Sequence, residues 1–210
     1  MIDYSVYLVS DRGLAHGRTT LDILKAAIQG GVSCVQLREK SCSTREFIEE
    51  ALVIRALLAE HNIPLIINDR IDVAMAVKAD GVHLGQQDMP CHMARELLPE
   101  NMVIGISAES LDDAIGAEKE GADYLGVSPI YATPTKTDTA IPLGLEGLRT
   151  IRAEVDIPLV GIGGLNDHNA AEVIHNGADG VAVVSAIVAA DDPETATRRL
   201  RNIVRQAKIK

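Results

Sequence analysis

Short apolar runs rich in Val, Ile and Leu recur along the chain, and longer segments with a helical spacing of apolar residues separate them. The runs predict eight buried parallel strands, at 6–10, 34–37, 64–68, 81–84, 103–107, 124–127, 159–162 and 180–185. The helical spacing is clearest at 19–29, 44–60 and 166–176. This alternation predicts an α/β fold, and the count of eight favours a (β/α)8 TIM barrel over an open doubly wound sheet.

The joints between these segments repeat one another. Ala and Asp, with a flanking Gly, lead into a predicted strand at 79–81, 121–123 and 177–180. No linker or low-complexity stretch divides the chain, so we expect a single compact barrel domain over residues 1–210. The longest predicted loop, 128–142, is either a disordered segment or a functional one, as loops of this length usually are.

Composition limits the classes of function. Apolar residues make up 47% of the chain and aromatic residues 2%, so we expect a core of Val, Ile, Leu and Ala. A formal net charge of -10 argues against nucleic-acid and anionic membrane partners, and directs attention to small-molecule substrates. We expect no signal peptide, because the first residues lead directly into a predicted strand, and no apolar run is long enough to span a membrane. The cysteines lack metal-ligand spacing, so we expect a cytoplasmic location with free thiols. Assembly into a homo-oligomer stays open.

Active sites of TIM barrels lie at the carboxyl ends of the strands, and the second predicted strand ends in charged residues. With a period of two, Gln36, Arg38 and Lys40 share one face, and Leu37 and Glu39 share the other. Two cations and an amide on one face suit a phosphate or pyrophosphate. The alternative is a layer of structural ion pairs inside the barrel.

The next strand ends carry further polar side chains. Asp69 and Asp88 follow neighbouring strands and are interpreted either as helix N-caps or as carboxylates that share one Mg²⁺ with a substrate phosphate. His83 is either a buried structural residue or a catalytic one. Ser107 either donates to an oxyanion or caps the following helix, and it lacks the sequence context of an activated nucleophile.

A second anion site is predicted on the later strands. Thr133, Thr135 and Lys136 in the long loop are placed to cradle an anion. Gly164 and Ser185 lie at the ends of the last two predicted strands, where TIM barrels often bind phosphate through backbone N–H groups and a helix N-terminus. The strand ends therefore predict an enzyme with two anion sites at one rim.

Over nearly its whole length, the chain resembles the thiamine-phosphate synthase family. The motifs that carry the resemblance are Gln-Leu-Arg-Glu-Lys at 36–40, Asn68-Asp69-Arg70, the segment 80–88, Gly105-Ile-Ser107, Thr133-Pro-Thr-Lys136, Gly161-Ile-Gly-Gly164 and Val184-Ser185. The resemblance implies a Mg²⁺-dependent transferase that condenses 4-amino-2-methyl-5-(diphosphomethyl)pyrimidine with a thiazole phosphate. Thiamine phosphate and pyrophosphate are the implied products, formed by a dissociative substitution that needs no protein nucleophile.

The resemblance also implies the role of each residue. The pyrimidine pyrophosphate would be bound by Gln36, Leu37, Arg38, Glu39, Lys40, Asn68, Ser107 and Lys136. The thiazole phosphate would be bound by Thr133, Pro134, Thr135, Gly164, Val184 and Ser185. Asp69 and Asp88 would hold Mg²⁺, and Ser107, Lys136 and Arg38 would act in catalysis.

Two other kinds of TIM-barrel enzyme and a TIM barrel without catalytic activity remain as alternatives. A thiazole tautomerase of the same superfamily would not need the pyrophosphate and metal residues of this chain. A sugar-phosphate isomerase or epimerase would share the phosphate site of the last two strands but not the cationic strand end. A regulatory barrel without activity would not need the full set of polar residues.

Overall fold

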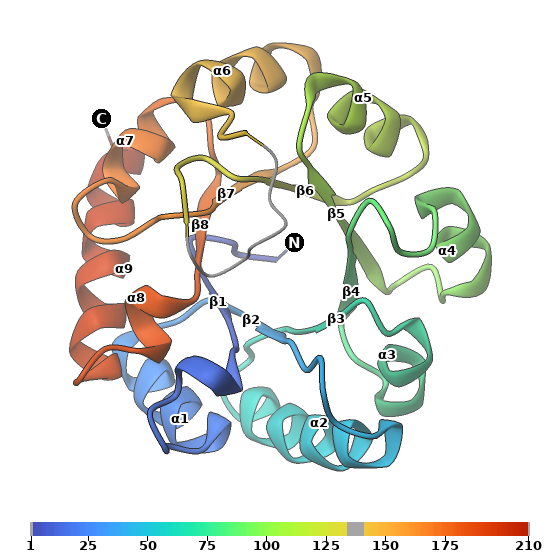
Figure 1. The fold of residues 1–210 in the computed structure, drawn as a ribbon, viewed down its shortest axis with the longest axis vertical. Helices are drawn as coiled ribbons and strands as arrows, with labels where there is room; N and C mark the ends of the chain where they lie inside the picture. The colour runs from blue at the N-terminus through green and yellow to red at the C-terminus, as the bar shows by residue number, and fades with distance from the viewer. Residues whose placement is uncertain (1, 134–140, 210) are drawn as a thin grey trace.

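The computed structural model describes residues 2–133 and 141–209, and within them eight parallel strands close into a barrel (Figure 1). The strands are β1 (Val6–Val9), β2 (Cys34–Leu37), β3 (Leu65–Asn68), β4 (Gly81–Leu84), β5 (Val103–Ala108), β6 (Tyr124–Val127), β7 (Leu159–Ile162) and β8 (Gly180–Val183). Each strand pairs with the next in the chain, and β1 pairs with β8. The predicted (β/α)8 barrel is therefore confirmed, and the open doubly wound sheet is excluded.

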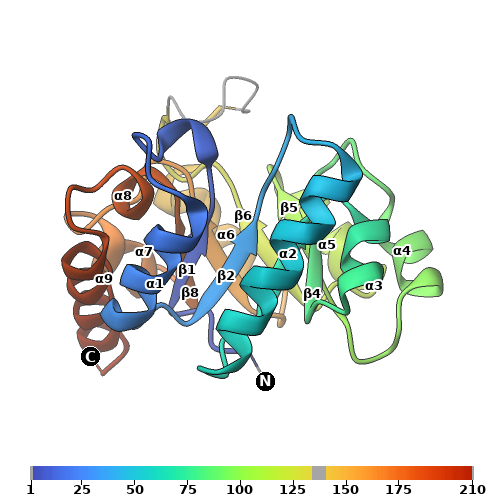
Figure 2. The same ribbon diagram turned by 90° about the horizontal axis from the view of Figure 1, so that it is seen from below.

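Helices surround the barrel (Figures 1 and 2). They are α1 (Thr20–Gly30), α2 (Thr44–Ala59), α3 (Ile71–Val77), α4 (Cys91–Leu97), α5 (Leu111–Lys119), α6 (Gly144–Glu154), α7 (Ala170–His175), α8 (Ser185–Val188) and α9 (Pro193–Ile209), with a 3-10 turn η1 (Arg12–Leu14) after β1. The eighth unit thus has two helices, and Ser185 begins α8 instead of ending the last strand. Figure 2 shows both chain termini at the end of the barrel opposite the loops that follow β1 and β2.

Polar side chains fix where several helices begin. The Thr19 hydroxyl accepts a hydrogen bond from the backbone N–H of Asp22 at the start of α1. Ser43 and Glu46 form a reciprocal capping box at the start of α2. Gly31 ends α1 with a φ of 91°, a conformation that glycine adopts without steric cost.

The repeated Ala-Asp joints fix the starts of alternate strands. Asp80, Asp123 and Asp179 precede β4, β6 and β8, and each carboxylate accepts a hydrogen bond from a backbone N–H at the start of the preceding strand. These bonds reach Leu65 at 2.8 Å, Ile104 at 2.7 Å and Leu159 at 2.8 Å. The sequence repeat is therefore a structural device that sets neighbouring strands side by side at the amino end of the barrel.

The core has two parts. The larger part, between the strands and the helices, consists mainly of Val, Ile, Leu and Ala, as expected. The smaller part, inside the barrel, contains Tyr4, Tyr7 and Tyr124, and the ring centroids of Tyr4 and Tyr124 lie 4.6 Å apart. Most of the few aromatic side chains are thus concentrated beneath the rim at which the strands end.

Two further expectations from the sequence concern membrane-spanning segments and the cysteines. None of the helices within residues 2–133 and 141–209 is long and apolar enough to cross a membrane. Cys34, Cys42 and Cys91 are free, as the sequence predicts. The cytoplasmic location stays a prediction.

Candidate functional site

A cavity of about 330 Å³ opens at the carboxyl ends of the strands, which is the size range of small-molecule sites. It brings together most of the residues that the sequence analysis names as candidates: Gln36, Arg38, Lys40, Asn68, Asp69, His83, Asp88, Ser107, Thr133, Gly164, Val184 and Ser185. Pro134, Thr135 and Lys136 lie outside the residues that the structure describes. The single rim predicted from the TIM-barrel rule therefore exists as one cavity.

Two cationic side chains line the side of the cavity at the ends of β2 and β3. Nη1 of Arg38 lies 3.2 Å from Oδ2 of Asp11, and Nζ of Lys40 is in direct contact with the carboxylate of Asp69. Gln36 and Asn68 are buried beneath them. Each cation is held by a carboxylate at the rim, in reach of an anion that enters the cavity.

Leu37 and Glu39 lie on the other face of this strand end, as the period of two requires. Leu37 is part of the core between barrel and helices, and neither side chain lines the cavity. Oε1 of Glu39 lies 3.3 Å from Nε of Arg12, and burial raises the pKa of Glu39. Both side chains therefore face away from the cavity, and the prediction that these two residues bind substrate stays a prediction.

The two predicted metal ligands lie close together. Oδ2 of Asp88 accepts a hydrogen bond from the backbone N–H of Gly85 at 2.7 Å, and its carboxyl group interacts with that of Asp69. Burial raises the pKa of Asp88, and Asp69 adds to the effect. Neither residue caps a helix, because the N-cap positions of α3 and α4 are Arg70 and Pro90 and have no side-chain hydrogen bond.

This pair suits a magnesium ion better than a metal with soft ligands. Mg²⁺ takes oxygen ligands and is commonly held by one or two carboxylates together with substrate phosphate oxygens. Within residues 2–133 and 141–209 no group of three or more His, Cys, Asp or Glu side chains is placed to hold a metal without a substrate. Two carboxylates at the edge of an open cavity therefore fit Mg²⁺ shared with a phosphorylated ligand.

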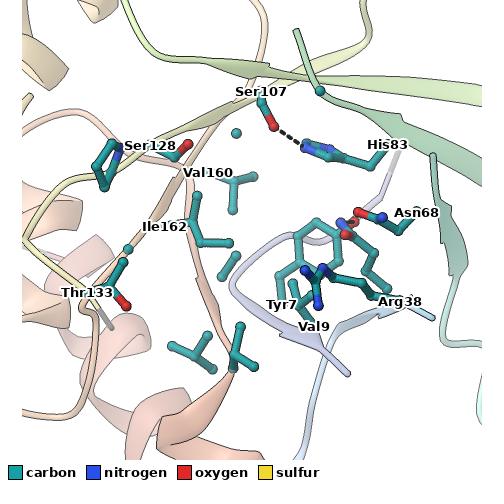
Figure 3. A pocket seen from close by; sticks show the side chains of 18 of the residues that line it. Tyr7, Val9, Arg38, Asn68, His83, Ser107, Ser128, Thr133, Val160 and Ile162 are labelled. Carbon is teal, nitrogen blue, oxygen red and sulfur yellow. Dashed lines mark hydrogen bonds between the residues drawn. The ribbon is translucent and has the colours of Figure 1, made fainter. Parts of the chain in front are cut away.

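Gly163, Gly164 and Ser185 line the opposite side of the cavity. Gly163 and Gly164 have φ of 101° and 67°, and a Cβ atom at Gly164 would lie 2.9 Å from the carbonyl oxygen of Ala132. The backbone N–H of Tyr131 donates to the carbonyl of Gly163 at 3.1 Å, which ties the loop after β6 to the loop after β7. Figure 3 shows Thr133 on this side, across the cavity from Arg38 and Asn68.

His83 and Ser107 lie on the floor of the cavity. Nε2 of His83 lies 3.0 Å from Oγ of Ser107, as drawn in Figure 3, and Nδ1 lies 2.9 Å from Oη of Tyr124. Ser107 belongs to β5 and does not cap α5, whose N-cap is Ser110. Ser107 is therefore placed where a bound molecule would touch it, and His83 is its hydrogen-bond partner.

The cavity residues that sequence reasoning missed include Asp11, Tyr7 and Tyr124. Asp11 follows the first strand, so the rule used for the other strand ends would have found it. Tyr7 and Tyr124 point into the barrel from β1 and β6, and their hydroxyl oxygens lie 2.8 Å apart. Nothing in the sequence pairs these two residues, because 117 positions separate them.

Together, the fold and the cavity define a class of protein: a TIM-barrel enzyme that acts on small molecules, with a cavity that is cationic on one side and lined by glycines on the other. A family model described as thiamine monophosphate synthase matches residues 6–187. The chain belongs to this family.

Individual relatives agree over nearly the whole chain. A thiamine-phosphate synthase of Chloroflexus aurantiacus is 55% identical over 97% of this chain and 94% of its own length. One of Albidiferax ferrireducens is 58% identical over 95% of this chain and 91% of its own length. The solved structure of thiamine phosphate pyrophosphorylase from Pyrococcus furiosus is 42% identical, covers 98% of this chain and 97% of its own, and superposes with a TM-score of 0.90.

The predicted activity is thereby confirmed at the level of the enzyme: a thiamine-phosphate synthase, of the transferase class. The relatives also favour this activity over the tautomerase and the sugar-phosphate isomerase or epimerase.

Proposed function

We propose that this enzyme condenses 4-amino-2-methyl-5-(diphosphomethyl)pyrimidine with a thiazole phosphate, in a Mg²⁺-dependent reaction that releases pyrophosphate. The observation that supports this proposal most strongly is the single cavity, whose two sides differ chemically. Arg38, Lys40 and the carboxylates of Asp69 and Asp88 line one side, and Gly164 and Ser185 belong to the other. Two phosphorylated substrates need two such sides facing each other.

The pyrophosphate is assigned to the cationic side. Arg38 and Lys40 would exchange their present carboxylate partners for pyrophosphate oxygens, and charge-assisted hydrogen bonds of this kind are the strong ones. Lys136, which lies outside the described residues, is assigned to the same group by the family resemblance. Gln36 and Asn68 would hold the pyrimidine part below, and the Ser107 hydroxyl would donate to a pyrophosphate oxygen.

The thiazole phosphate is assigned to the glycine-lined side. Gly164 has a left-handed backbone and no side chain, so a phosphate can approach its backbone closely. Ser185 offers a hydroxyl at the start of α8, and Val184 lines the cavity beside it. Thr133 extends this side from the loop after β6, and the family resemblance adds Thr135 from the undescribed part of that loop.

Asp69 and Asp88 would hold Mg²⁺ at the edge of the cationic side. When bound, the ion neutralises charge on the departing pyrophosphate. The bond between the methylene carbon and the pyrophosphate oxygen breaks, and its electron pair leaves with the oxygen. The pyrimidine amino group stabilises the resulting cation, and the thiazole nitrogen donates its lone pair to the methylene carbon. The protein supplies positioning, charge stabilisation and exclusion of water instead of a nucleophile.

Two-substrate kinetics test this division of the cavity. Arg38→Ala should raise KM for the pyrimidine substrate about 10-fold or more, because it removes a charged hydrogen bond worth about 1.5–3 kcal/mol. Ser185→Ala should instead raise KM for the thiazole phosphate, by roughly 2–10-fold for a single hydroxyl. Equal effects of each variant on both substrates would contradict the two-sided assignment.

A further inference from the structure

A continuous chain of hydrogen bonds crosses the floor of the cavity. Nε2 of Gln36 donates to Oη of Tyr7 at 3.0 Å, and the hydroxyls of Tyr7 and Tyr124 lie 2.8 Å apart. The chain continues from Tyr124 to Nδ1 of His83 at 2.9 Å and from Nε2 of His83 to Ser107 at 3.0 Å. Its two ends, Gln36 and Ser107, are both assigned to the pyrimidine substrate.

The middle of this chain is closely packed. Tyr7 and Tyr124 are 1% and 0% exposed, and burial raises the pKa of both phenols, so they stay protonated at neutral pH. A Cβ atom at Gly105 would lie 2.0 Å from Cζ of Tyr124, and one at Gly126 would lie 2.9 Å from Cε1 of His83. Two glycines on β5 and β6 therefore leave just enough room for these rings in one position.

The chain satisfies every group when its bonds run in one direction. Because Tyr7 accepts from Gln36, its own proton is available for Tyr124. Tyr124 then donates to Nδ1 of His83, and His83 carries its proton on Nε2 and donates to Ser107. In this arrangement each hydroxyl both accepts and donates, which strengthens neighbouring bonds.

The opposite direction is weaker. With Nε2 of Gln36 facing Tyr7, Tyr124 would then donate to Tyr7, and the proton of Tyr7 would have to go to the thiol of Cys34, the side chain beside it inside the barrel. Sulfur is a weak acceptor compared with a phenol oxygen. The Ser107 hydroxyl would donate its hydrogen bond to His83, and it could then only accept a hydrogen bond from a ligand.

We propose that Tyr7, Tyr124 and His83 are positioning residues that fix the Gln36 amide and the Ser107 hydroxyl relative to each other, with His83 protonated on Nε2. This inference rests on the proposed function, because both ends of the chain are assigned to the pyrimidine substrate. Ser107 then presents its proton to the cavity, where it donates to an oxygen of the pyrophosphate. Gln36 presents its carbonyl oxygen and its second N–H to the edge of the heterocycle.

The tautomer of His83 tests the direction without any assay of activity. We expect ¹⁵N NMR of the substrate-free protein to show Nε2 of His83 protonated and Nδ1 unprotonated at neutral pH. The His83→Gln variant assigns the signal. A proton on Nδ1, or a mixture of the two tautomers, would overturn the proposal. Tyr124→Phe removes the donor to Nδ1 and should turn a single tautomer into a mixture.

A matched pair of substitutions tests the positioning role. In His83→Gln the side-chain amide reaches the position of Nε2 and can still donate to Ser107. In His83→Asn the amide stays near the position of Nδ1, so the donor to Ser107 is lost. We expect His83→Asn to lower kcat/KM for the pyrimidine substrate about 10–100-fold, and His83→Gln to recover most of this loss.

The remaining outcomes are also distinct. KM for the thiazole phosphate should not change in either variant, and thermal unfolding identifies any variant that has lost its fold. Equal losses in folded His83→Gln and His83→Asn, or no loss in either, would overturn the positioning role. If the wild-type protein made no thiamine phosphate, the proposed function would fail, and the tautomer measurement would still decide on the hydrogen-bond chain.

Discussion

The backbone of Asp69 has a φ of 61°, in the left-handed region that Asp and Asn tolerate better than most residues. This turn directly after β3 places the carboxylate against Lys40 and beside Asp88. A substitution that tests the charge should therefore keep this backbone conformation, and Asn is the suitable replacement.

Asp69→Asn should lower Mg²⁺-dependent turnover about 100-fold or more, because it removes a charged oxygen ligand from the proposed metal pair. The control is Asp72→Asn, since Asp72 is exposed and pairs with Arg70 outside the cavity. Turnover at increasing Mg²⁺ concentration checks both variants. Unchanged turnover in folded Asp69→Asn would contradict the metal assignment.

At this scale the alternation along the strand predicted which side chains share a face, and the family resemblance did not. Gln36, Arg38 and Lys40 reach the cavity because they alternate along an extended strand, and the same alternation turns Leu37 and Glu39 away. The family resemblance treated all five alike, since a motif does not say which side chains face the ligand.

Among the elements, β5 and β6 depend on a glycine at the point where they face each other. Gly105→Ala would place a methyl group 2.0 Å from the ring of Tyr124, which is completely buried. We expect a loss of at least about 1–3 kcal/mol in the free energy of unfolding from overpacking. Gly116→Ala in the following helix α5 is the control, with no atom within 4 Å of the new Cβ.

Urea unfolding of both glycine variants checks this prediction. Gly116→Ala should stabilise the protein by about 0.5–1 kcal/mol, because alanine loses less conformational entropy in a helix. Equal stability of the two variants would show that β6 moves away from β5 at little cost. The hydrogen-bond chain through Tyr124 would then lack the rigid support assigned to it.

Element boundaries were predicted less well than element order. The predicted helix at 166–176 begins only at Ala170, because the backbone N–H of Asn166 donates to Oδ1 of Asn169 at 2.9 Å in a turn before it. The predicted strand at 180–185 ends at Val183, and Ser185 opens α8. Local turn chemistry of Asn169 decided the first case, and hydrophobic periodicity does not record it.

At the scale of the whole molecule, a chain with a formal net charge of -10 places Arg38 and Lys40 at the cavity where its proposed substrates bind, alongside the carboxylates that pair with them. Physical reasoning from the strand count reached the barrel and two anion sites. It could not name the molecules, because Arg, Lys and glycine turns bind many phosphates alike. The family resemblance supplied that step. The polar chain inside the barrel was not predictable, since it depends on the register of strands that are distant in sequence.

Ligand binding should stabilise the entire barrel, because the cavity takes residues from strands around its circumference. Mg²⁺ with pyrophosphate, at about 100 times the dissociation constant, should add about 2.7 kcal/mol to the free energy of unfolding. For a domain of this length the melting temperature should rise by about 5–10 °C. Calorimetry checks this shift, which should nearly vanish in Asp69→Asn. A full shift in that variant would contradict the shared metal site.

The most direct test of the central claim is turnover with both substrates. Purified protein is mixed with the pyrimidine pyrophosphate, the thiazole phosphate and Mg²⁺, and thiamine phosphate and pyrophosphate are quantified together. We predict that the two products form in equal amounts, that neither substrate alone gives thiamine phosphate, and that chelation of the metal stops the reaction. A folded protein that gives no product with Mg²⁺ or Mn²⁺ would contradict the account.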